Sequence, residues 1–177
     1  LFNIIEDPLE ETNLISSQPA LADSMKKDLQ QWFGGIRTEE HSFEMPLFLI
    51  GYQGKKQSTV WAKGPDTIAS SLKNTFNWLE GWRQVGDYAT YKIQVETPGK
   101  YELIMNHDSS VASRATMKIS IADQENNVMI LNNQNVGCGS FDLQEGKMLL
   151  KVEVVHTSGY TNAAVMDRLI SFTFKRE

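Results

Sequence analysis

The sequence predicts a mainly β protein, an antiparallel β-sandwich or barrel preceded by a short strand and one amphipathic helix. Three observations predict this. After residue 69, apolar and polar residues alternate with a period of two in several short segments. Turn signals separate these segments at regular intervals, which is typical of sandwiches and barrels. Near the start of the chain, apolar residues instead recur at helical spacing. The strand order cannot be read from these patterns.

The first 35 residues differ from the rest of the chain. Residues 1–5 form a short apolar run that we expect to be a strand, ended by Asp7 and Pro8. A helix is expected to follow. It should begin near Pro19, which two serines precede, and it should end at Gly34 and Gly35. Its apolar face comprises Leu21, Met25, Leu29, Trp32 and Phe33. A helix this short is unstable alone in water, so this face should pack against a larger body.

Three parts are expected along the chain: residues 1–35, a charged linker at 36–44, and a sandwich domain at 45–177. Within the domain, a turn at residues 98–100 joins two clearly alternating segments. The expected strands include residues 91–95, 101–105, 117–121, 150–154 and 170–174.

Composition excludes several classes of partner. The net charge is -5 and no basic run occurs, which argues against nucleic acid. No apolar run approaches the roughly 20 residues of a membrane span. Residues 1–5 are followed at once by Glu6 and Asp7 and do not resemble a signal peptide. The lone Cys138 rules out an internal disulfide and is expected to be a small buried residue.

The opening segment carries a family resemblance. Residues 1–14, followed by a helix ending in Trp32 and Phe33, resemble the closing segment of type I, alkaline-phosphatase-like sulfatases, whose pattern is L-Y-N-L-x-x-D-P-x-E-x-x-N-L. In that family the segment is structural. The resemblance implies a bacterial parent sulfatase acting on sulfated glycans, a missing catalytic domain as partner, and a periplasmic or secreted location.

The rest of the chain resembles the jelly-roll carbohydrate-binding modules appended to glycoside hydrolases, and an extra C-terminal domain of some bacterial sulfatases. The resemblance lies in Trp82, the Gly86-Asp87 pair before Tyr91, the Pro98-Gly99-Lys100-Tyr101 turn, and residues 167–170 before the last strand. It implies that the sandwich is a jelly roll. These modules usually carry a second stacking tryptophan, which residues 132–141 do not supply.

Catalytic chemistry is not expected in this chain. A sulfatase of this family needs formylglycine, made from Cys or Ser in C/S-x-P-x-R, and a calcium ion. The sequence after Cys138 contains neither the Pro nor the Arg of this motif, and no Ser fits the motif. His41, His107 and His156 lie far apart in sequence and lack metal-ligand spacing. No cofactor is therefore required here, although the parent enzyme would use calcium and formylglycine.

Aromatic rings that could stack on a sugar lie before a strand, at Trp78 and Trp82. For both, the alternative is packing under the sandwich, and this is favoured for Trp82. Trp61 is expected to be buried. His107 and Asp108 end a strand where loops gather and could bind hydroxyl groups, with a solvated turn as the alternative.

The loop before the last strand contains Tyr160 and Asn162, and the module resemblance implies that Asn162 contacts ligand. A plain turn is the alternative. The same resemblance makes Asp167 a candidate ligand of a structural calcium ion. The alternative is that its side chain caps or hydrogen-bonds the local backbone.

Two functions remain open. In the first, the sandwich is a carbohydrate-binding module that holds a polysaccharide or glycosaminoglycan-type glycan. In the second, it packs on the catalytic domain and stabilises it without binding sugar.

Overall fold

The computed structural model describes residues 1–36, 47–109, 115–130, 135–157 and 165–177. The chain divides into two compact units, Leu1–Glu44 and Met45–Glu177. No helix among the described residues is long and apolar enough to cross a bilayer.

The first unit contains the predicted helix, α1, at Pro19–Ile36. It continues through Gly34 and Gly35, which were expected to end it, and the side chains of its apolar face are exposed. The predicted strand at residues 1–5 is wrong. Asn3 holds a turn there, because its carbonyl oxygen accepts hydrogen bonds from the backbone N–H groups of Glu6 and Asp7. Its side-chain oxygen accepts a third from Ile5. The four apolar residues of this segment have no partner strand among the described residues, so they have no ladder to join.

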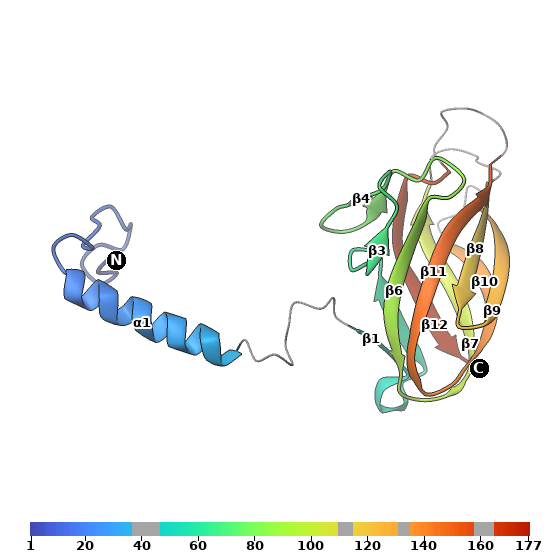
Figure 1. The fold of residues 1–177 in the computed structure, drawn as a ribbon, viewed down its shortest axis with the longest axis horizontal. Helices are drawn as coiled ribbons and strands as arrows, with labels where there is room; N and C mark the ends of the chain where they lie inside the picture. Colours follow the sequence, from blue (N-terminus) through green and yellow to red (C-terminus); the bar gives the residue numbers. More distant parts are fainter. Residues whose placement is uncertain (37–46, 110–114, 131–134, 158–164) are drawn as a thin grey trace. The chain divides into compact units, whose positions relative to one another are not determined.

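The second unit is a β-sandwich of two antiparallel-rich sheets, which confirms the predicted fold (Figure 1). Its only parallel pair among the described strands is β1 with β6. The first sheet contains β1 (Phe48–Ile50), β6 (Tyr88–Val95), β11 (Gly146–His156), β8 (Ala115–Ile121) and β9 (Gln124–Ile130), in that order, with β3 (Thr67–Ile68) also paired to β6. The second contains β10 (Asn135–Leu143), β7 (Gly99–Asp108), β12 (Arg168–Arg176), β5 (Leu79–Glu80) and β4 (Lys73–Asn74), with β2 (Gln57–Trp61) also paired to β12. A short 3-10 helix, η2 (Tyr52–Gly54), follows β1.

The core lies between the two sheets and is built from the inward-facing residue of each alternating pair. On β7, for example, Tyr101, Leu103 and Met105 are fully buried, whereas Glu102 is exposed. The rings of Tyr91 and Phe172 meet edge to face across the sheets, 5.7 Å apart. Cys138 is buried as expected, and desolvation raises the pKa of its thiol to about 12.

Strand β12 lies inside the second sheet and has two different partners along one edge. β7 pairs with it from Arg168 to Arg176 on one side. On the other side, β5 pairs with its first two residues and β2 pairs from Ser171 to Lys175. The register against β7 shifts between Leu169 and Ser171, so Ile170 lies in a β-bulge at the point where the partner changes. On this side of β12 the position of the neighbouring strand is therefore shared by two strands, β5 beside its first residues and β2 beside the rest.

The Gly86-Asp87 pair of the sequence resemblance has a structural role. Gly86 has φ +92°, which favours glycine. The Asp87 carboxylate is fully buried. It accepts hydrogen bonds from the backbone N–H groups of Arg83, at 2.7 Å, and Gln84, at 3.0 Å, and from the Ser71 hydroxyl. Asp87 thus fastens the segment after Trp82 to the chain before β4.

Replacing this carboxylate should destabilise the sandwich strongly. Asp87→Ala takes the acceptor from two backbone N–H groups and a hydroxyl and leaves a cavity at a fully buried position, so we expect a loss of about 2–4 kcal/mol in the free energy of unfolding. The exposed Asp123→Ala serves as control and should change it by less than about 0.5 kcal/mol. Urea unfolding followed by tryptophan fluorescence measures both, and equal effects would rule out the anchoring role of Asp87.

Candidate functional site

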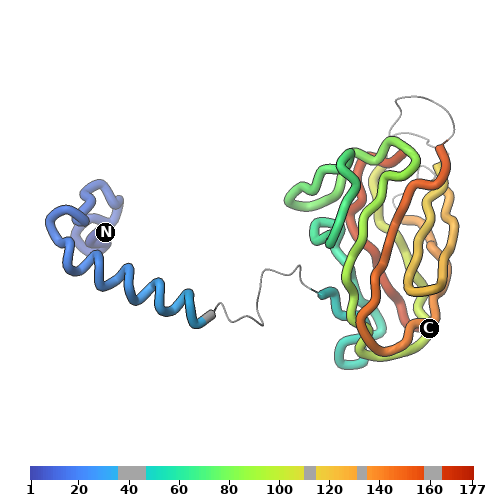
Figure 2. The backbone as a smooth tube through the Cα atoms, in the orientation of Figure 1, coloured from blue at the N-terminus to red at the C-terminus, as the bar shows by residue number. Residues whose placement is uncertain are grey.

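A groove of about 410 Å³ opens where β12 changes partner. Its floor includes Ile170, the residue in the bulge. The end of β2 provides one side of the groove and the β4–β5 hairpin provides another. This hairpin projects from the body of the sandwich in the ribbon and in the tube (Figures 1 and 2). The lining residues are Trp61, Lys63, Asn77, Trp78, Asp108, Arg168 and Ile170.

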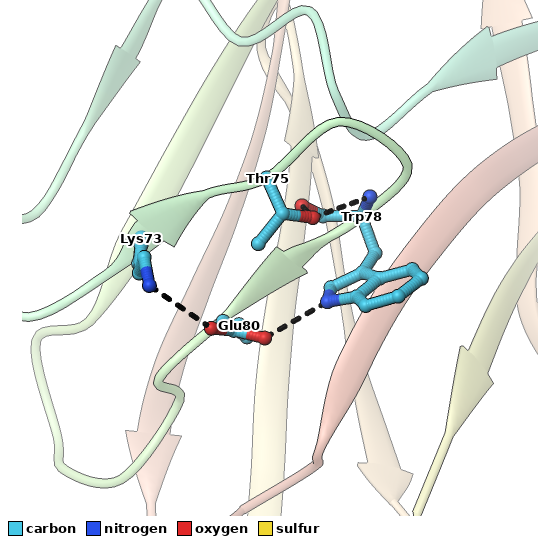
Figure 3. Close-up of polar contacts among 4 residues, drawn as sticks. All are labelled: Lys73, Thr75, Trp78 and Glu80. Carbon is cyan, nitrogen blue, oxygen red and sulfur yellow. Dashed lines mark hydrogen bonds and ion pairs between the residues drawn. The ribbon is translucent and has the colours of Figure 1, made fainter.

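Trp78 is held in place by the turn of the hairpin. The Thr75 hydroxyl donates to the Trp78 carbonyl at 2.7 Å and accepts from its backbone N–H at 3.1 Å. The indole Nε1–H donates to Glu80 Oε2 at 2.8 Å, and Figure 3 shows Glu80 between this indole and Lys73. The Arg168 guanidinium lies over the ring, 4.5 Å from its centroid. These contacts fix the ring before any ligand arrives, which reduces the entropy lost on binding.

Trp61 is half exposed, so the prediction that it is buried is wrong. It is the last residue of β2, and it shares the outward face of that strand with Gln57 and Thr59, while Val60 faces the core. The alternation of polar residues at 57 and 59 was the signal that could have placed Trp61 outside. Its partner on the neighbouring strand, Ser171, begins the part of β12 that pairs with β2.

Charged groups surround the two tryptophans. The Lys63 ammonium lies 5.3 Å from the centroid of Phe76, whose ring is strongly exposed at the hairpin tip. Arg168 Nη1 lies 3.6 Å from Asp108 Oδ2. Lys63, Phe76 and Arg168 were missed by sequence reasoning, because single exposed residues outside a periodic pattern carry no signal of what they face.

Of the six predicted ligand-binding residues, Trp78 and Asp108 lie at the groove, and their binding role stays a prediction. Trp82 is fully buried and its indole donates to the Leu79 carbonyl at 3.2 Å, so it belongs to the core and offers no ring to a sugar. Tyr160 and Asn162 lie outside the described residues. Asp167 lines a neighbouring hollow. No cluster of three or more metal-ligating side chains occurs in the part of the chain that the structure describes, and the calcium proposal remains untested.

His107 is also fully buried and is neither a loop contact nor part of a solvated turn. It continues the inward face of β7, opposite Leu169. Neither ring nitrogen has a hydrogen-bond partner among the described residues. Desolvation lowers its pKa, and the neighbouring Asp108 carboxylate opposes this in part. The imidazole is therefore neutral in the folded protein near pH 7.

Comparison with known proteins supports the fold. No protein-family model and no curated protein matches the chain. Among solved structures, the chain is similar to a family 35 carbohydrate-binding module from Clostridium thermocellum, with a TM-score of 0.53 and 12% identity, covering 68% of this chain and 98% of that one. It also resembles the GH26-CBM35 β-(1,4)-mannanase of Podospora anserina (TM-score 0.53, 12% identity, 69% and 28% covered). The insecticidal crystal protein Cry2Aa gives a TM-score of 0.59 at 13% identity, with 73% and 23% covered.

The chain thus spans less than a third of the mannanase and of the insecticidal protein, but nearly all of the isolated module. At these identities the likeness concerns the fold alone. The second unit has the jelly-roll sandwich fold found in carbohydrate-binding modules.

The buried His107 should make stability depend on pH. Its folded-state pKa is lowered, whereas the unfolded chain titrates near 6.5, so the unfolded state binds the proton first. Stability should therefore fall as pH decreases below about 6.5. His107→Leu should lose less stability than the wild type between pH 7.5 and 5, as measured by urea unfolding across that range.

The matched control is His156→Leu, because His156 is exposed. It should follow the wild-type pH profile. A His107→Leu profile that coincides with that of the wild type would contradict the assignment of a buried imidazole without a hydrogen-bond partner among the described residues.

Proposed function

We propose that the sandwich is a carbohydrate-binding module whose ligand lies in the groove between Trp61 and Trp78. The observation that carries the proposal is that two tryptophans, one half exposed and one held by its neighbours, line the same groove. Its volume of about 410 Å³ falls in the range of small-molecule sites. The jelly-roll fold shared with solved carbohydrate-binding modules supports the same class of function.

The chemistry of the lining suits a sugar. The apolar C–H face of a pyranose packs on an aromatic ring, and its hydroxyl groups need donors and acceptors nearby. Asn77 offers both a carbonyl oxygen and an NH₂ group, and Asp108 offers carboxylate oxygens. One face of Trp78 is already covered by Arg168, so a sugar has the rest of that ring and the exposed part of Trp61.

A finer proposal concerns the parent protein. The resemblance of residues 1–14 and the helix that follows is to the closing segment of a sulfatase, so the module would hold an exported sulfatase on its glycan. This parentage rests on that segment alone, because none of the solved structures reported above is a sulfatase. The encoded sequence upstream of Leu1 tests it: a C/S-x-P-x-R motif supports the proposal and a different catalytic domain refutes it.

Removing either ring should weaken glycan binding. Trp61→Ala and Trp78→Ala each lose stacking area, so we expect about a tenfold or larger increase in the dissociation constant. Isothermal titration calorimetry against a panel of neutral and acidic polysaccharides identifies the tightest binder and measures the variants on it.

The matched control is Tyr52→Ala, an exposed aromatic residue in η2 and outside the groove. It should bind like the wild type. If no polysaccharide of a broad panel binds, or if Trp61→Ala and Trp78→Ala bind as tightly as Tyr52→Ala, the proposal fails.

A further inference from the structure

We propose that the glycan is acidic and lies across two adjoining hollows, with its anionic groups held by Lys63 in one and Arg83 in the other. This inference rests on the proposed sugar-binding function and names the class of sugar. It follows from where the charged side chains of the second sheet lie.

The second hollow adjoins the groove and has a volume of about 510 Å³. Arg168 lines both, and Glu80, which lines the second, accepts the hydrogen bond from the Trp78 indole. The lining residues of this second hollow are Ser71, Lys73, Glu80, Gly81, Trp82, Arg83, Met166, Asp167 and Arg168. A chain of sugars that leaves the groove past Trp78 would therefore enter this hollow.

The balance of charge over the two hollows differs from that of the whole protein. The chain has a net charge of -5. Among the described residues, the linings of the two hollows together contain four cations, Lys63, Lys73, Arg83 and Arg168, against three carboxylates, Glu80, Asp108 and Asp167. The described lining of the two hollows thus carries one more cation than carboxylate, although the whole chain is acidic. Such an arrangement favours an anionic ligand over a neutral one.

Two of these cations are available to a ligand. Among the described residues, neither the Lys63 ammonium nor the Arg83 guanidinium forms an ion pair, and Arg83 is exposed. The other two have partners: Lys73 Nζ lies 3.9 Å from Glu80 Oε1, and Arg168 lies beside Asp108. These contacts also reduce the repulsion that Glu80 and Asp108 would exert on an incoming anion.

The two cations without an ion pair among the described residues suit carboxylate and sulfate groups alike. The planar guanidinium of Arg83 can donate two parallel hydrogen bonds to either anion, and Lys63 acts as a point charge. Because both side chains are exposed to solvent, their attraction for the ligand should weaken as salt is added. Stacking on the tryptophans should depend much less on salt.

The test uses the tightest binder from the polysaccharide panel and derivatives of its own backbone. For chondroitin sulfate these are the desulfated, the carboxyl-reduced, and the desulfated and carboxyl-reduced forms. We expect the fully neutral derivative to bind about tenfold or more weakly than the acidic parent. Loss on desulfation alone assigns the recognised anion as sulfate, and loss on carboxyl reduction alone assigns it as carboxylate.

Charge-neutralising variants locate the effect. Lys63→Gln and Arg83→Gln should each raise the dissociation constant of the acidic glycan about threefold or more and flatten its dependence on salt. Lys147→Gln removes an exposed cation on β11 of the other sheet and should leave both unchanged. A neutral polysaccharide as the tightest binder, or equal effects of all three variants, overturns the inference while leaving the proposed function intact. The absence of any binder overturns the proposed function itself.

Discussion

The hydrogen bond from the Ala62 N–H to the Ile170 carbonyl, at 3.0 Å, closes the gap in the second sheet at the point where β2 ends and β5 has not yet begun. It supplies a donor to the carbonyl group of the bulged residue. The same bond holds the end of β2 beside β12, so Trp61 stays at the edge of the groove. The change of partner from β2 to β5 along β12 therefore leaves no break in hydrogen bonding at Ile170.

A second set of contacts joins the two sides of the groove. The Asn74 side-chain amide donates to the Lys63 carbonyl at 3.1 Å and connects the β4–β5 hairpin to the turn after β2. Within the hairpin, Thr75 and Glu80 orient Trp78. Binding therefore need not order these elements, and the interaction energy of a ligand is not spent on fixing them. Two buried polar residues have opposite effects on stability. The Asp87 carboxylate anchors the chain around it, whereas the buried His107 makes the folded state less stable at acidic pH.

Alternation predicted five of the long strands, β6, β7, β8, β11 and β12, because one face of each is buried and every second side chain lies in the core. It did not predict β9 or β10. It could not find β3, β4 or β5, since two residues have no period. The groove was also out of reach, because it depends on pairs distant in sequence, such as Trp61 with Ser171 and Leu79 with Leu169. Residues 1–5 were predicted to be a strand because most of them are apolar. No described strand pairs with them, and the turn at Asn3 forms instead.

The most direct test of the account is a two-dimensional ¹⁵N NMR titration of the four tryptophan indoles with an acidic oligosaccharide. The indoles report three places: α1 for Trp32, the groove for Trp61 and Trp78, and the core for Trp82. The account predicts saturable shifts of the Trp61 and Trp78 signals, with those of Trp32 and Trp82 nearly unchanged. Shifts confined to Trp32, or a binding ligand that leaves both groove indoles unmoved, would contradict it.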